Sequence, residues 1–130
     1  MKKTRSKRRP AHPFAYEGLD RVMHERARLG VLTSLLAHPA GLSFAAIKQL
    51  CDLTDGNLSR HLDVLESARL VEITRETGAG RPQSLCRITA QGRRKFLGYL
   101  SVLERVLLDA GAVPEREERR PGALLHLAPR

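Results

Sequence analysis

The spacing of apolar residues changes at Arg69-Leu70, and that change constrains the fold more than any other feature. Before Arg69-Leu70, apolar side chains recur every three or four residues, which is the period of an amphipathic α-helix. After that point, residues 71–75 and 84–88 alternate apolar and polar side chains, as strands do. The cluster Gly78-Ala79-Gly80-Arg81-Pro82 lies between them and is typical of a turn. The pattern predicts helices followed by a β-hairpin.

Three helices are predicted before the hairpin and one after it. The first covers about residues 19–38. Ser43 is expected to cap the second helix and Thr54 the third, because a hydroxyl at that position accepts a hydrogen bond from a helix N-terminus. The last helix is long, begins after Thr89 and continues to about Gly111. The predicted fold is therefore mainly α with a β-hairpin wing, a winged helix-turn-helix with a long C-terminal dimerisation helix.

The length of 130 residues suits one domain, and a hydrophobic content of 42% is enough to build a core. We assign residues 17–113 to a winged-helix domain that includes the last helix. Residues 1–16 are expected to be a basic flexible tail, and residues 114–130 a second tail of charged and apolar residues.

The net charge of +9 favours a polyanionic partner, but its distribution weakens that argument. Six basic residues and no acidic residue lie in residues 1–9, so much of the excess belongs to a tail. Total charge alone is weak evidence for a nucleic-acid fold, and the argument has to rest on particular residues.

Several classes of protein are not expected. The 2 cysteines and 5 histidines do not have the spacing of metal ligands, so no metal and no cofactor is predicted. Cys51 is expected to be a buried structural thiol. No phosphate-binding loop, nucleophile motif or carboxylate pair is seen, so we expect no enzyme. No secretory signal is recognised, and the longest uncharged span, residues 29–47, is broken at Pro39. A cytoplasmic protein without a membrane segment is the expectation.

The start of the predicted third helix has the residues that a DNA-reading helix needs. A helix in the major groove requires small or hydrogen-bonding side chains at its N-terminal end, where base edges lie closest. Gly56 costs roughly 1 kcal/mol against Ala but lets the backbone approach DNA. Arg60 can pair bidentately with guanine, and Asn57 suits adenine or a phosphate. With the recognition helix at 54–68, the expected DNA contacts are Thr54, Gly56, Asn57, Ser59, Arg60, His61 and Asp63.

Two of these residues have an alternative reading. Arg60 is also explained as a solvated arginine on a helix surface. His61 lies beside the predicted core stripe of Leu58 and Leu62, so it is explained equally well by packing or by a hydrogen bond to the backbone.

The hairpin, residues 75–87, is expected to contact DNA as a wing. Arg81 at its tip suits insertion into a narrow minor groove, although an ordinary loop charge is the alternative. Arg75 and Arg87 on the two arms are expected to contact phosphates.

The last helix has the pattern of a dimer interface. Phe96, Leu100, Leu103 and Leu107 recur at the spacing of a heptad seam. Tyr99, Val102 and Val106 form a second apolar stripe beside it. Because one small domain has one core to cover, two stripes indicate a second chain, and we expect a homodimer.

The segment 43–107 resembles the bacterial winged-helix transcriptional regulators of the MarR and ArsR kind. The resemblance is carried by residues 53–62, 65–71 and 88–92, and it departs from the family at Arg69, where such proteins usually have Gly. It implies a homodimeric regulator that binds double-stranded DNA at specific sequences and has no enzyme activity. Whether a small molecule or a protein acts as effector is left open. The alternative is a winged-helix module that mediates protein contacts without specific DNA binding.

Overall fold

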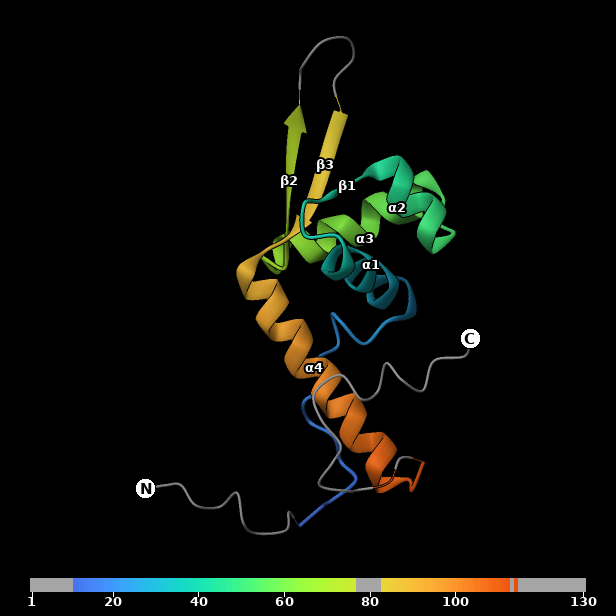
Figure 1. Ribbon diagram of the computed structural model, residues 1–130, viewed down its shortest axis with the longest axis vertical. Helices are drawn as coiled ribbons and strands as arrows, with labels where there is room; N and C mark the ends of the chain where they lie inside the picture. The colour runs from blue at the N-terminus through green and yellow to red at the C-terminus, as the bar shows by residue number, and fades with distance from the viewer. Residues whose placement is uncertain (1–10, 77–82, 113, 115–130) are drawn as a thin grey trace.

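The computed structural model describes residues 11–76, 83–112 and 114 of the chain. In these residues, the helices and the strands of one small sheet follow in the order α-β-α-α-β-β-α (Figure 1). The predicted fold class is confirmed, whereas the predicted turn at 78–82 and its Arg81 lie outside the described residues. The elements are α1 (Arg26–Ala37), β1 (Leu42–Ser43), α2 (Phe44–Cys51), α3 (Asp55–Ser67), β2 (Val71–Glu76), β3 (Gln83–Ile88) and α4 (Ala90–Asp109).

The three predicted hydroxyl caps are all present. The side chains of Ser43, Thr54 and Thr89 each accept a hydrogen bond from the backbone N–H three residues further on, at 3.2, 3.1 and 2.8 Å. These bonds satisfy N–H groups that have no partner inside a helix, and they set where α2, α3 and α4 begin.

The first helix is shorter than predicted, because α1 begins at Arg26 rather than near residue 19. The Asp20 carboxylate accepts hydrogen bonds from the backbone N–H groups of Val22 and Met23, at 2.7 and 3.3 Å. Such local side-chain bonds offer the backbone an alternative to a helix. We call residues 11–24 the N-terminal arm; its Met23 is 4% exposed and belongs to the core.

The sheet contains one strand that was not predicted. Its order is β1-β3-β2, and every pairing is antiparallel. The short β1 pairs with β3 through Leu42 opposite Cys86 and Ser43 opposite Leu85. This pairing joins strand β3 of the wing to Ser43, the residue that caps α2. The position of the wing relative to the helix-turn-helix is therefore fixed by backbone hydrogen bonds.

The core gathers residues of α1, α2, α3, the sheet and the first half of α4. Thr89 joins these parts, because its hydroxyl donates to the Arg69 carbonyl at 2.8 Å and its N–H to the Leu70 carbonyl at 3.0 Å. A Cβ at Gly92 would collide with the Leu70 carbonyl, so only glycine allows α4 to cross so closely. Phe96 is 0% exposed and packs in this core, which corrects its predicted place in a dimer interface.

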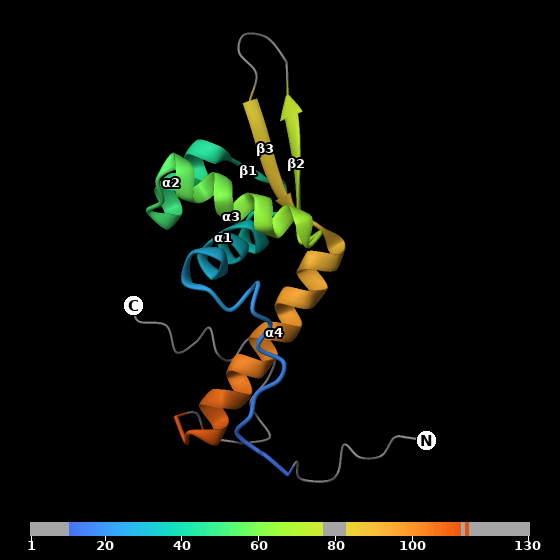
Figure 2. The same cartoon turned by 180° about the vertical axis from the view of Figure 1, so that it is seen from behind.

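The N-terminal arm runs alongside α4, as Figures 1 and 2 show from opposite sides. The Tyr16 hydroxyl donates to the Asp109 carboxylate at 2.6 Å, and His24 Nδ1 lies 2.7 Å from the Tyr99 hydroxyl. A Cβ built on Gly18 would lie 2.6 Å from the Val102 side chain. The second apolar stripe of this helix, which contains Tyr99 and Val102, is thus covered in part by the chain's own arm.

Within the described parts of the chain, no helix combines the length and apolar character needed to cross a membrane.

Candidate nucleic-acid interface

Helix α3 separates its core residues from the predicted DNA-contacting residues. Leu58, Leu62 and Leu65 are at most 1% exposed and hold the helix against the body of the domain. His61 is half-buried beside them. The other predicted contacts on this helix and its cap lie at the surface, namely Thr54, Gly56, Asn57, Ser59, Arg60 and Asp63.

The turn before α3 is held by backbone geometry and one ion pair. Asp52 adopts a left-handed conformation, with φ at 56°, and ends α2. Lys48 Nζ of α2 lies 2.6 Å from the Asp55 carboxylate in the first turn of α3. An exposed pair of this kind contributes little stability, about 0–1 kcal/mol, but it connects the two helices where they meet.

Arg60 and Asn57 contact each other on the exposed side of α3. The Arg60 guanidinium donates from Nη2 to the Asn57 side-chain oxygen at 2.7 Å. This bond leaves guanidinium N–H groups and both amide N–H groups of Asn57 as donors. The two predicted base-reading residues are therefore one hydrogen-bonded unit with donors left over at the surface of α3.

Gly56 has no structural reason to be glycine. No atom lies within 4 Å of a Cβ built at this position, and its backbone is not in the left-handed region. Because glycine inside a helix is unfavourable by about 1 kcal/mol, a packing or backbone requirement would normally explain it. Neither requirement is present at Gly56, so its predicted role as a point of close backbone approach stays a prediction.

The charge of α3 is not uniformly basic. Asp55, Asp63 and Glu66 are exposed on the same helix as the single arginine Arg60. A carboxylate near DNA repels phosphates but accepts a hydrogen bond from the cytosine amino group. If Asp63 meets DNA, base contact is the only favourable role for it, and the attraction to phosphates has to come from other residues.

The wing arginines do not share a face. Paired residues of neighbouring strands point to the same side of a sheet, and successive residues alternate. Arg75 pairs with Ser84 and is on the side of the buried Cys86, whereas Arg87 pairs with Glu72 on the opposite side. Arg87 Nη1 also lies 4.0 Å from the Glu72 carboxylate. The two residues predicted to contact phosphates together therefore face in different directions.

His61 faces α1. Its Nδ1 lies 3.2 Å from Nη1 of Arg28 and 3.9 Å from the Glu25 carboxylate. The backbone N–H of Arg28 donates to that carboxylate at 2.8 Å, which holds the pKa of Glu25 below its usual value. Neither Arg28 nor Glu25 was singled out from the sequence, since nothing in a helical pattern shows which surface charge meets another helix.

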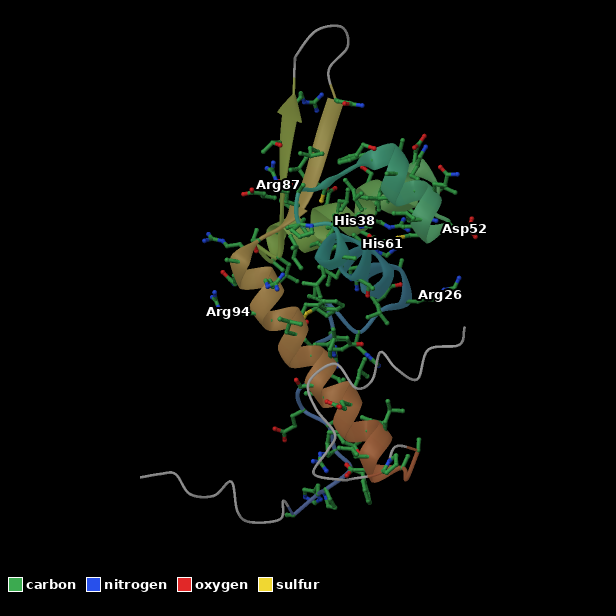
Figure 3. The ribbon with its side chains drawn as sticks, viewed as in Figure 1. Arg26, His38, Asp52, His61, Arg87 and Arg94 are labelled. Carbon is green, nitrogen blue, oxygen red and sulfur yellow. The ribbon has the colours of Figure 1, made fainter. Side chains whose placement is uncertain are left out.

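A groove of about 800 Å³ lies beside this cluster, between α1, the end of α2 and the start of α3. Asn57, Arg60 and His61 line it together with Cys51. Figure 3 shows His61 and Asp52 on this side of the molecule, away from Arg87 and Arg94.

The two cysteines differ in exposure. Cys86 is 0% exposed, and burial raises its pKa to about 12. Cys51 is half-buried rather than fully buried as predicted, and burial raises its pKa as well. In residues 11–76 and 83–112, no three His, Cys, Asp or Glu side chains come together as a metal site.

Comparison with known proteins agrees with this geometry. Residues 27–107 match the winged helix DNA-binding domain family, and the chain belongs to that family. The uncharacterized protein MJ0432 of Methanocaldococcus jannaschii is 36% identical over 73 residues, which cover 54% of this chain and 79% of that protein.

Solved structures show the same fold. A transcriptional regulator homologue from Pyrococcus horikoshii is 33% identical, with a TM-score of 0.65 over 71% of this chain and 89% of the other. A MarR-family regulator from Silicibacter pomeroyi is 19% identical, with a TM-score of 0.50 over 85% and 73% of the two chains. The expected winged-helix fold is confirmed, and the MarR-family structure shares it, while the resemblance to the MarR and ArsR groups of regulators stays a prediction.

Proposed function

We propose that this chain is a transcriptional regulator that binds double-stranded DNA at specific sequences as a homodimer. Residues 54–68 would enter the major groove, and the wing, residues 75–87, would reach the minor groove. The observation that supports this most is the exposed start of α3, where the Arg60–Asn57 unit stands beside a glycine that packing does not require. Enzymatic activity is not part of the proposal, and the bacterial cytoplasm is the proposed location.

The homodimer is proposed because a single recognition helix reads only a few base pairs. Two helices related by a twofold axis read half-sites about 34–36 Å apart, one turn of duplex. The proposed surface is on α4, where Leu97 is 43% exposed and Leu100, Leu103 and Leu107 are half-buried. Leu97 replaces Phe96 in the predicted set, because Phe96 is buried in the domain core whereas its neighbour Leu97 is exposed.

The experiment begins with selection of bound sequences from a pool of random duplexes. On the selected site, Arg60→Ala should weaken binding by roughly 1–3 kcal/mol while binding to random DNA changes little. Arg94→Ala is the matched control, since Arg94 is an exposed arginine on α4, on the opposite side of the molecule from Asp52 and the start of α3 (Figure 3). Equal losses on selected and random DNA would make Arg60 a phosphate contact.

A protein-interaction module is the second candidate, and one observation favours it. Leu50, at the end of α2, is 58% exposed beside the groove. Contiguous exposed apolar patches mark surfaces that bind protein partners, and Leu50 lines the groove together with the half-buried Cys51 and Leu53. Failure of the wild-type protein to prefer any duplex over random DNA would favour this candidate. The groove is also the proposed place for an effector, should one exist.

A further inference from the structure

One side chain, Arg28 of α1, connects three parts of the molecule. Its Nε donates to the Val22 carbonyl of the N-terminal arm at 2.6 Å. Its Nη1 lies 3.2 Å from Nδ1 of His61 on α3. Its backbone N–H donates to the Glu25 carboxylate that caps α1. Because the arm packs on α4, Arg28 stands between the proposed dimer helix and the proposed recognition helix.

A hydrogen bond from Arg28 requires an acceptor nitrogen on the His61 ring. A guanidinium has donors and no acceptor, so Nδ1 of His61 has to accept, and the ring proton is then on Nε2. The His61 side chain is 14% exposed. An imidazole with its Nδ1 occupied by an intramolecular donor is poorly placed to read a base edge through that atom.

The contact between Arg28 and His61 adds a directional restraint to the hydrophobic packing of α3. Leu58, Leu62 and Leu65 hold the helix on the core, but apolar packing is not directional. A hydrogen bond is directional, so the contact on His61 limits rotation and sliding of α3 about its axis. Asn57 precedes His61 by one helical turn and lies on the same side, next to Arg60.

We propose that Arg28 is a positioning residue for the recognition helix. It acts through His61, and by fixing that side chain it sets the direction in which the Arg60–Asn57 unit meets DNA. His61 then contributes to sequence specificity without touching DNA. For its effect on binding, this inference rests on the proposed function.

The test is a double-mutant cycle of Arg28→Met and His61→Leu, which remove the polar contact and retain most of the side-chain volume. The measured quantity is the ratio of the dissociation constant for random duplex to that for the selected site. Each single variant should lower this ratio about tenfold, and the double variant should be no worse than either. His61→Gln, whose amide oxygen can accept from Arg28, should stay within roughly twofold of wild type. Arg26→Met, at an exposed arginine in the same turn of α1, is the matched control.

The salt dependence of binding separates positioning from direct contact. A residue that contacts a phosphate reduces the slope of log affinity against log salt by about 1 when it is removed. We expect both single variants to keep the wild-type slope. Additive losses in the cycle, a reduced slope, or an unchanged ratio with only a lower melting temperature would overturn the proposal.

A measurement without DNA keeps this inference separate from the proposed function. Nitrogen NMR of the free protein should show His61 protonated at Nε2 and unprotonated at Nδ1. Arg28→Met should also accelerate amide exchange in the first turns of α3. A wild-type protein without DNA preference would contradict the proposed function alone. The opposite tautomer, or unchanged exchange in the variant, would contradict the role of Arg28.

Discussion

Arg69 stands where winged-helix regulators usually have glycine, and its backbone adopts the conformation that a glycine would have there. It follows α3, has φ at 64°, and thus adopts the left-handed conformation that favours glycine. Its N–H donates to the Glu66 carbonyl at 2.9 Å, and the next N–H, of Leu70, donates to the Leu65 carbonyl at 3.0 Å. The turn into the hairpin is therefore formed with an arginine in a conformation that costs about 1–2 kcal/mol for an ordinary residue.

Arg69→Gly should consequently stabilise the fold. Relief of the left-handed strain is offset in part by the greater entropy of glycine in the unfolded chain, so the expected net gain is about 0.5–1 kcal/mol. Urea denaturation of wild type and variant measures it. Arg69→Ala, which removes the same charge but keeps a Cβ, is the control and should show no such gain. Equal stabilisation by both variants would assign the effect to charge rather than to backbone conformation.

The sequence predicted the outward residues of α3 correctly because the three leucines on one side of the helix define which side packs on the core. Helical period alone placed Arg60 at the surface and Leu62 in the core. It could not decide His61, which lies at the edge of the core stripe, because that depends on which residue of α1 faces it. The contact with Arg28 joins residues 33 positions apart, and no local pattern contains that information.

Among the helices and strands, the sequence predicted those whose ends are marked by local residues. It did not predict those that form only through contacts with distant residues. The caps at Ser43, Thr54 and Thr89 are local features, and all are observed. The strand β1 has only two residues and exists because it pairs with β3, so it has no period of its own. The apolar residues Leu19, Val22 and Met23 of the arm resembled part of a helix, but they lie outside any helix and pack in or against the core.

The start of α1 depends on the ionised Glu25, which makes its stability dependent on pH. The bond from the Arg28 N–H lowers the pKa of this carboxyl from its usual 4.5. A lowered pKa in the folded state means that the stabilisation is complete above about pH 4.5 and is lost as pH falls through the folded value. Glu25→Ala should cost about 1 kcal/mol at pH 7, as removal of an N-cap usually does.

The measurement is the free energy of unfolding of wild type and Glu25→Ala from pH 7 down to pH 3. The difference between the two proteins should shrink below about pH 4.5. Glu17→Ala, at an exposed carboxylate in the arm, controls for the general effect of removing a negative charge. A difference that stays constant over this range would show that the ionised form of Glu25 does not support the cap.

At the scale of the whole molecule, α4 extends beyond the core, and its two ends have different surroundings (Figure 1). Near the wing, Phe96 and Tyr99 pack inside the domain. Further along, the arm covers one side of the helix from Val102 to Asp109. The heptad pattern did not distinguish these surroundings, because a core stripe and a coiled-coil seam share the same spacing.

The half-buried Leu107 provides the sharpest test of the proposed dimer. Unlike Phe96, it has exposed surface, so Leu107→Asp should place an unpartnered carboxylate between two α4 helices while leaving the winged helix folded. We expect the variant to sediment as a monomer at micromolar concentration, to keep its helical circular dichroism and to lose binding to the selected DNA site. Ser101→Asp puts the same charge on an exposed position of α4 and should remain dimeric. If Leu107→Asp instead unfolds the protein, this leucine supports the chain's own fold. A wild-type protein that is monomeric and still binds its selected site would contradict the homodimer itself, because one recognition helix would then suffice for specificity.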